Sequence, residues 1–149
     1  MMRSYVIDTN LVFSAAMSQK SAIAQFIMVE SLEAASYYAP AYLKEEINNH
    51  FDKIVAQSKL SPSEVRENLR LVYTRIAFIS DDQIPIAYYS RAAVLVRQVD
   101  VNDIVFVALA AYLNQSLWTG DRKLYRHLVK GGFQSVLNFS QLKKELGME

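Results

Sequence analysis

The sequence predicts an α/β fold with a central parallel sheet of about five strands, covered by helices on both faces. Two observations predict it. Short apolar runs alternate along the chain with longer segments whose apolar residues recur every three or four positions. Only four glycines and three prolines interrupt the chain, so its connections are short. Strands separated by helices pair in parallel, because each crossover helix packs onto a face of the sheet.

The N-terminal part is expected to contribute two strands with helices between them. Both strands are short apolar runs, and the second helix has apolar residues spaced by three and four. The expected strand, helix, helix and strand lie, in order, at residues 4–7, 11–16, 22–32 and 36–39. Pro40 closes the second strand and suits the first turn of the helix that follows.

Two helices and a third strand come next. An apolar stripe at helical spacing predicts one continuous helix after Pro40. Its members are Leu43, Ile47, Phe51 and Ile54. The run Ser61-Pro62-Ser63-Glu64 predicts the start of another helix, with Ser61 as N-cap and Glu64 completing a capping box. The third strand is expected at residues 75–80.

The C-terminal part completes the alternation. The expected helices lie at residues 85–97, 101–113 and 125–129, and the expected strands at 117–119 and 135–137. Asn114 ends the second of these helices, and Gly131-Gly132 stops the third. Ser140 is expected to cap a last helix.

Length and composition limit the class of protein. A chain of 149 residues can bury one core, so we expect a single domain over residues 1–149. It has no run of about eighteen apolar residues and enters its first strand at once, so we expect neither a membrane helix nor a signal peptide. The absence of cysteine fits a cytoplasmic protein. The net charge of +1 gives no overall attraction for nucleic acid, which would need a local basic patch.

Acidic residues follow two of the expected strands. Asp8 ends the first strand and is the only acid among the first 29 residues, so it is not part of a solvated charge pattern. Asp121 follows the fourth strand after one glycine. Because parallel strands end at the same edge of a sheet, both carboxylates are expected at the edge where α/β proteins build their sites.

Two further acids stand at the start of the helix expected over residues 101–113. Asp100 is placed to act as an N-cap, and Asp103 lies in the first turn, where an acid complements the helix dipole. These structural roles would explain either residue alone. Beside Asp8 and Asp121, a functional role is favoured for Asp103.

A pair of acids, Glu45 and Glu46, lies in the helix expected after Pro40. Glu46 is one position from Ile47 and three from Leu43, which places it at the border of the buried face, whereas Glu45 points further toward solvent. Most glutamate pairs on helices are merely solvated. The wider acidic pattern is what favours Glu46.

Gathered carboxylates predict a bound cation. Carboxylates within several ångströms repel one another and raise each other's pKa. Mg²⁺ or Mn²⁺ prefers oxygen ligands and removes this penalty. The chain has no cysteine and only two histidines, which excludes thiol chemistry and disfavours a histidine-based metal site. Such a cation orients a phosphodiester, so a nucleic-acid backbone is the expected substrate.

The chain resembles the PIN domain, and within it the VapC-like ribonuclease toxins of toxin–antitoxin pairs. The resemblance covers nearly the whole chain and rests on three stretches: Val6-Ile7-Asp8-Thr9-Asn10, Asp103 at the head of its apolar helix, and Leu117-Trp118-Thr119-Gly120-Asp121-Arg122-Lys123-Leu124. It implies a three-layer α/β/α sandwich and a Mg²⁺- or Mn²⁺-dependent endoribonuclease that hydrolyses RNA phosphodiester bonds. It also implies a small antitoxin partner and a homodimer.

The resemblance also assigns roles to residues. The catalytic acids would be Asp8, Glu46, Asp103 and Asp121. Three of them would hold the metal ion, namely Asp8, Asp103 and Asp121. Asn10 and Thr119 would orient these carboxylates. Asp100 would be a further ligand, a partner of the metal through water, or only a cap. Glu45 could replace Glu46, because the sequence does not fix the register of the helix.

A basic stretch follows Asp121. Arg122, Arg126 and Lys130 recur every four residues and would share one helix face beside the acidic site. Such a face could bind RNA phosphates. An ordinary solvated helix, whose cations complement its C-terminus, is an equal alternative.

Other functions are less consistent with the motifs. The main alternative is a PIN-like module that binds RNA or protein without cutting, but a pure binder has no need of paired carboxylates near a phosphate. A haloacid-dehalogenase-type phosphatase needs a second aspartate two residues after Asp8, where Asn10 stands. A dinucleotide-binding fold needs a glycine-rich turn after the first strand.

Overall fold

A parallel sheet forms the centre of the protein. The computed structural model describes residues 2–96 and 98–148, and within them five strands are ordered β3-β2-β1-β4-β5, with every neighbouring pair parallel. The strands are β1 (Arg3–Ile7), β2 (Ala35–Pro40), β3 (Ile76–Ile79), β4 (Ser116–Trp118) and β5 (Val136–Leu137). The predicted α/β fold with a central parallel sheet is confirmed.

The strand order creates a switch point between β1 and β4. The chain runs from β1 outward to β2 and β3, and then places β4 and β5 on the other side of β1. The connections that leave β1 and β4 therefore diverge at adjacent carboxyl ends, which is where α/β sheets form a crevice. The two ends are joined by a hydrogen bond of 3.0 Å that the Asp8 backbone N–H donates to the Trp118 carbonyl.

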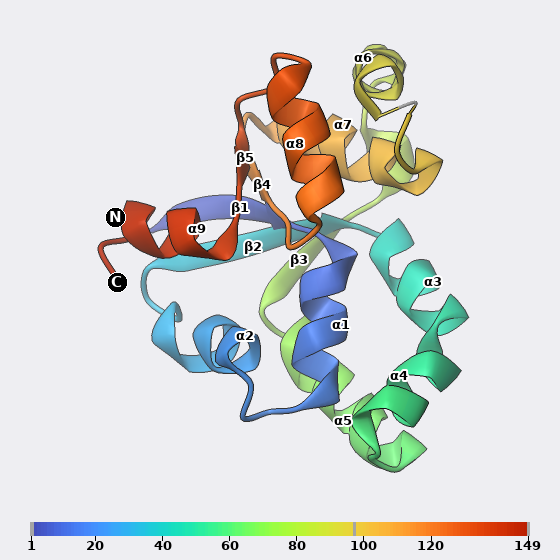
Figure 1. Ribbon diagram of the computed structural model, residues 1–149, viewed down its shortest axis with the longest axis vertical. Helices are drawn as coiled ribbons and strands as arrows, with labels where there is room; N and C mark the ends of the chain where they lie inside the picture. Colours follow the sequence, from blue (N-terminus) through green and yellow to red (C-terminus); the bar gives the residue numbers. More distant parts are fainter. Residues whose placement is uncertain (1, 97, 149) are drawn as a thin grey trace.

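Helices cover both faces of the sheet and give three layers (Figure 1). One face carries the segments between β1 and β3, which are α1 (Thr9–Met17), α2 (Ala22–Gln25), the π-helix η1 (Phe26–Glu30), α3 (Tyr42–Asn49), α4 (Phe51–Ser58) and α5 (Pro62–Tyr73). The other face carries α6 (Ile86–Val96), α7 (Ile104–Leu113) and α8 (Arg122–Lys130), with the 3₁₀ turns η2 (Asp81–Gln83) and η3 (Val101–Asp103) before α6 and α7. The last helix is α9 (Phe139–Glu145). In the described part of the chain, none of the helices has the length and apolar character needed to cross a membrane.

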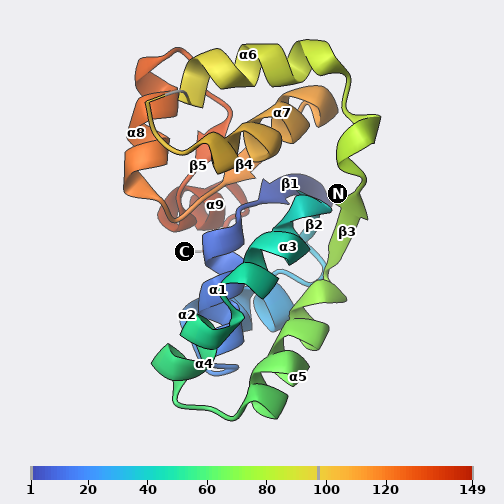
Figure 2. The same ribbon diagram turned by 90° about the vertical axis from the view of Figure 1, so that its right-hand side faces the viewer.

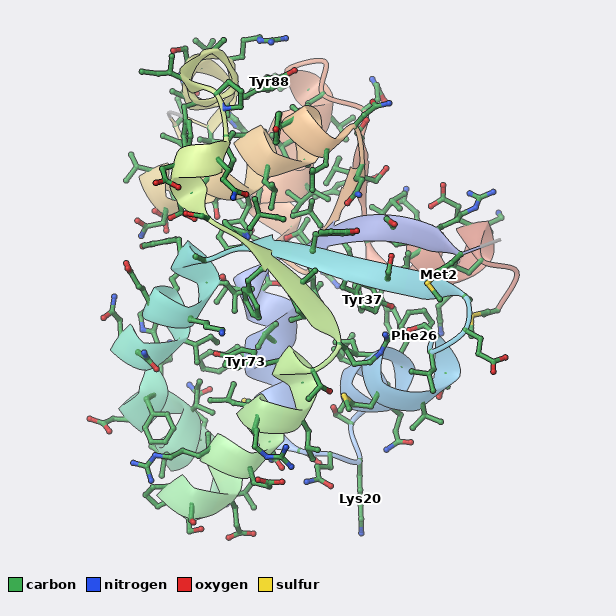
Figure 3. All side chains as sticks on the ribbon, turned by 180° about the vertical axis from the view of Figure 1, so that it is seen from behind. Met2, Lys20, Phe26, Tyr37, Tyr73 and Tyr88 are labelled. Atoms are coloured by element: carbon green, nitrogen blue, oxygen red, sulfur yellow. The ribbon has the colours of Figure 1, made fainter. Side chains whose placement is uncertain are left out.

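An aromatic cluster fills the core beneath the strand ends. Trp118 is fully buried, and its ring centroid lies 5.7 Å from the rings of Phe26, Tyr37 and Phe139. Figure 3 labels Phe26 and Tyr37 on this side of the sheet. The cluster ties β4 to β2, η1 and α9, so it fixes the strand that leads into Asp121.

The helix starts follow local capping chemistry. Asp8 caps α1 and Asp121 caps α8, so both helices begin two or three residues earlier than their apolar patterns indicate. The capping box at the start of α5 is confirmed, because Ser61 accepts from the Glu64 N–H and Glu64 accepts from the Ser61 N–H.

The continuous helix predicted after Pro40 is wrong. Pro40 is the last residue of β2, and α3 begins at Tyr42 with Ala41 as a cap that makes no side-chain bond. The helix is also interrupted at His50, whose φ of −111° and ψ of 13° are not helical. Its N–H bonds the Ile47 carbonyl, and the chain then restarts as α4. The apolar stripe persists across the break, which is why periodicity alone did not reveal it.

Three other predicted helices differ in detail. The helix expected over residues 22–32 is a short α-helix followed by a π-turn, in which Ser31 donates both its N–H and its hydroxyl to the Phe26 carbonyl. The helix expected over 101–113 starts with a 3₁₀ turn. Asn138, rather than Ser140, caps α9. The expected end of α6 at Arg97 lies outside the described residues.

Candidate active site

Asp8 is anchored at the carboxyl end of β1. Its side chain is only 4% exposed. Oδ1 accepts a hydrogen bond of 2.8 Å from the Thr9 N–H, and Oδ2 accepts one of 2.7 Å from the Thr119 hydroxyl. Both carboxylate oxygens are therefore held in place, and the carboxylate is fixed at the switch point.

The loop after β4 places Asp121 beside Asp8. The Thr119 hydroxyl, which donates to Asp8, also accepts a bond of 3.0 Å from the Asp121 N–H. Asn10 Oδ1 accepts from the Gly120 N–H at 3.1 Å and so holds the middle of the loop. Asp121 uses Oδ1 to cap α8, where it accepts from two backbone N–H groups at 3.0 Å each. Thr119 and Asn10 thus support the positions of the two aspartates.

Asp103 differs from the other acids in having no structural use. It stands at the N-cap position of α7, yet within the described residues its side chain makes no capping bond. Its Oδ2 is buried and has no hydrogen-bond partner among them. Asp100, in contrast, caps η3 by accepting from the Asn102 N–H at 2.9 Å. The capping role expected of Asp100 is therefore observed. Asp103 stands where an acid complements the helix dipole, but this role leaves its buried Oδ2 without a partner among the described residues, which is costly.

The register of α3 separates the two glutamates. Glu46 is half-buried, and its Oε1 accepts a hydrogen bond of 2.6 Å from the Thr9 hydroxyl. Glu45 is exposed and does not line the acidic cavity. Thr9 follows Asp8 directly, so this hydrogen bond holds Glu46 next to the end of β1.

These acids share one cavity of about 370 Å³, which opens at the carboxyl ends of the strands that face the viewer in Figure 2. Its lining residues are Asp8, Thr9, Asn10, Phe13, Ser14, Glu46, His50, Lys53, Asp100, Asp103 and Asp121. The chain contributes them from four regions: the end of β1 with α1, the α3–α4 segment, η3, and the loop after β4. Residues that are far apart in sequence thus form a single acidic site.

The donor set fits a hard divalent cation. The acids offer only oxygen ligands, which Mg²⁺ and Mn²⁺ prefer, and the unpartnered Oδ2 of Asp103 is a ready acceptor. Across residues 2–96 and 98–148, no three acidic or histidine side chains are arranged closely enough to enclose a metal ion as they stand. Repulsion between carboxylates opposes a closer approach unless a cation screens it.

Burial and repulsion raise the pKa values of three of these acids. The pKa of Asp103 is raised from 3.8 to about 8, chiefly by burial and then by the negative charges of Asp8 and Asp100. Burial also raises the pKa of Asp8 to about 6, although its hydrogen bonds from Thr119 and Thr9 act in the opposite direction. The pKa of Glu46 is raised by burial as well. Carboxyl groups with such raised pKa values in one cavity are typical of functional sites.

Two cationic residues in this cavity were not identified from the sequence. His50 and Lys53 line it from the α4 side. With Glu46 they stand at positions i, i+4 and i+7, so helical spacing alone could have placed all three on one face.

The basic residues after Asp121 lie beside the acidic cavity. Arg122 and Arg126 line a neighbouring cavity of about 460 Å³, and Asp121 lines both cavities. Lys130 is exposed at the far end of α8 and lines neither cavity. The structure thus places the two arginines at a cavity next to the acidic one and leaves the lysine further along the helix.

Comparison with known proteins agrees with this architecture. A model of the PIN domain matches residues 6–141. No curated protein matches the chain. The chain is similar to the crystal structure of PAE2754 from Pyrobaculum aerophilum, with 17% identity, a TM-score of 0.68, and coverage of 99% of this chain and 91% of that one. It is also similar to a chain of VapBC2 from Rickettsia felis bound to a DNA fragment from their promoter, with 15% identity, a TM-score of 0.67, and coverage of 91% of this chain and 98% of that one. At these identities the structures show the fold alone, whereas the family model spans most of the sequence. The protein belongs to the PIN domain family.

Proposed function

We propose that this protein is a divalent-metal-dependent endoribonuclease and the toxin of a toxin–antitoxin pair. The observation that carries the proposal is the acidic cavity at the switch point, where Asp103 is half-buried, keeps Oδ2 buried without a partner among the described residues, and makes no capping bond. PIN domains are generally nucleases, which supports hydrolase activity. The similarity in fold to a VapBC2 chain supports the toxin assignment and a small antitoxin as partner. We propose a single PIN domain over residues 1–149 that acts as a homodimer.

The metal ion, Mg²⁺ or Mn²⁺, would be held by Asp8, Asp103 and Asp121. When bound, such a cation lowers the pKa of a water molecule and stabilises negative charge on the leaving oxygen. Asp100 lines the same cavity, but its capping bond at η3 makes it the less available carboxylate.

The remaining residues would position the acids and the substrate. Thr119 and Asn10 keep the ends of β1 and β4 together, so the carboxylates stay aligned. Glu46 would accept a hydrogen bond from the attacking water and orient it toward the phosphorus. Arg122 and Arg126 would bind RNA phosphates, with Lys130 adding charge further along α8.

Cleavage of RNA by the purified protein tests this function. Total cellular RNA is incubated with the protein and Mg²⁺ or Mn²⁺, with and without chelator, and new 5′ ends are mapped. We expect discrete cuts that require the metal. Glu46→Gln is expected to reduce the rate roughly 10² to 10⁴-fold, the range of general acid–base contributions. The matched control Glu45→Gln, which removes the neighbouring exposed charge, is expected to cleave like the natural protein.

Two outcomes would contradict the proposal. Equal cutting by the natural protein, Glu46→Gln and a chelated sample would identify a contaminating nuclease. RNA that stays intact with metal present would favour a non-catalytic PIN-like module that binds RNA or protein.

A further inference from the structure

The acidic cavity has a cationic wall. Of the described residues that line it, two can carry positive charge, His50 and Lys53, and both come from the α4 side. Arg122 and Arg126 belong to α8, which lies in the layer on the other face of the sheet (Figure 1). The carboxylates at the strand ends therefore have basic residues on both sides.

Lys53 is not used to neutralise the acids. The ion pairs formed within residues 2–96 and 98–148 are Arg3–Glu145 and Arg70–Glu67, so none of the carboxylates in these ranges lies within 4.0 Å of the Lys53 ammonium group. Its Nζ instead lies 6.0 Å from the centroid of the Phe13 ring, which also lines the cavity. The side chain is exposed. An ammonium group that faces a cavity without pairing with its acids is available to an anion from outside.

The helix break explains how the cation reaches the cavity. His50 ends α3 and precedes α4, and Lys53 lies in the first turn after this break. Glu46 of α3, His50 at the break and Lys53 of α4 line the same cavity. The α3–α4 segment thus presents one carboxylate and two basic groups to the site.

We propose that Lys53, assisted by His50, binds a phosphate of single-stranded RNA next to the scissile bond, on the side of the cavity away from α8. The inference takes its ligand, RNA, from the proposed function. The strand would cross the acidic cavity with one flanking phosphate at Lys53 and others at Arg122 and Arg126. Lys53 is a substrate-binding residue in this arrangement and takes no part in proton transfer.

The alternative role for Lys53 is that of a general counter-charge to the acids. The two roles differ in their effect on the salt dependence of RNA binding. Removing a phosphate-binding lysine weakens binding and reduces its dependence on salt, because fewer counterions are released. Removing a counter-charge that contacts no phosphate leaves the slope of log K against log salt unchanged.

Binding of a fluorescent single-stranded RNA oligonucleotide tests the proposal without cleavage. The full chain carries Asp103→Asn to prevent cutting, chelator is present throughout, and the dissociation constant is measured by anisotropy over a range of KCl concentrations. Lys53→Ala in this background is expected to raise the dissociation constant about fivefold and to lower the slope of log K against log salt by about 0.7, the value for one single-strand phosphate contact. Lys53→Arg is expected to retain the slope.

The control is Lys20→Ala, which removes the same charge from an exposed lysine in the loop before α2, at the end of the molecule shown in Figure 3. We expect it to bind like the background protein. The proposal is overturned if Lys53→Ala binds RNA with unchanged affinity and slope, or if the background protein binds no RNA. The binding assay does not depend on cleavage. If the protein binds RNA through Lys53 but makes no metal-dependent cuts in the separate cleavage assay, the ribonuclease is refuted and the phosphate contact at Lys53 stands.

Discussion

Replacing Asp103 with asparagine is expected to reduce RNA cleavage roughly 10³-fold and to stabilise the folded protein at alkaline pH. The expected loss of activity follows from the proposed role of Asp103 as a metal ligand, since the charge stabilisation that a cation supplies amounts to several kcal/mol. The gain in stability follows from the environment of Asp103, which is half-buried beside other acids and lacks a hydrogen-bond partner for its buried Oδ2 among the described residues. Catalysis and stability therefore make opposite demands at this position.

The pH dependence of the stability gain can be derived from the raised pKa. Below pH 3.8 the carboxyl group is protonated in both the folded and the unfolded protein, so the asparagine variant gains nothing. Between pH 3.8 and about 8 the folded protein binds the extra proton, and its stability falls as the pH rises. Above about pH 8 the full cost of the buried charge is present. After allowance for partial exposure to solvent, we expect a gain of about 2 kcal/mol at pH 9.

Urea unfolding in chelator at pH 4 and pH 9 measures this difference. Glu45→Gln, which removes an exposed acid, serves as the control and should change little at either pH. The environment described for Asp103 would be contradicted if the two proteins differed in free energy of unfolding by the same amount at both pH values. It would also be contradicted if the natural protein were more stable than Asp103→Asn at pH 9.

Trp118→Ala is expected to lower the free energy of unfolding by about 3–5 kcal/mol, the range for large aromatic residues cut back to alanine in a core. Trp118 is fully buried and contacts three aromatic rings, so the change leaves a large cavity beneath the site. Its carbonyl also accepts from the Asp8 N–H. We therefore expect cleavage to fall as well, through misplacement of the strand ends.

Trp118→Phe distinguishes the effect of lost side-chain volume from the effect of the unsatisfied indole N–H. The indole Nε1 is buried and has no hydrogen-bond partner in the described part of the chain, so phenylalanine removes an unsatisfied donor while keeping an aromatic ring. We expect Trp118→Phe to lower the free energy of unfolding much less than Trp118→Ala does, as measured by urea unfolding at a single pH. A loss below about 1 kcal/mol for Trp118→Ala would show that this cluster does not anchor β4.

The sheet and its acidic edge could be predicted because both depend on local patterns. The strands are short apolar runs, and a parallel arrangement places the residues after β1 and β4 together whatever the details of the loops. Asp8 and Asp121 therefore meet where the alternation of strands and helices predicts. The start of α5 could be predicted for the same reason, since a capping box lies within four residues.

Features that depend on register or on competing caps could not be predicted in the same way. Glu45 and Glu46 differ by one position, and only the observed start of α3 turns Glu46 toward Thr9. Asn138 and Ser140 are both good caps, and Asn138 prevails because Gln141 stands three residues on and completes a capping box.

The structural difference between Asp100 and Asp103 also depends on tertiary contacts. Both stand near the start of one helical segment, and sequence alone gives both a structural role. In the structure Asp100 takes the capping bond, whereas Asp103 is directed into the acidic cavity and is affected by the charges of Asp8 and Asp121. The distinction depends on segments more than ninety residues apart in the chain.

Binding of Mn²⁺ to the purified protein, followed by electron paramagnetic resonance at pH 8, tests the acidic site most directly. We expect the natural protein to bind Mn²⁺ and to bind it more tightly as the pH rises from 6 to 8, because the cation must displace the proton held on Asp103. Asp103→Asn should bind it at least tenfold more weakly, and Glu45→Gln should bind it normally. Equal Mn²⁺ affinity in the natural protein and Asp103→Asn, or no binding to either, would show that these carboxylates do not form a metal site.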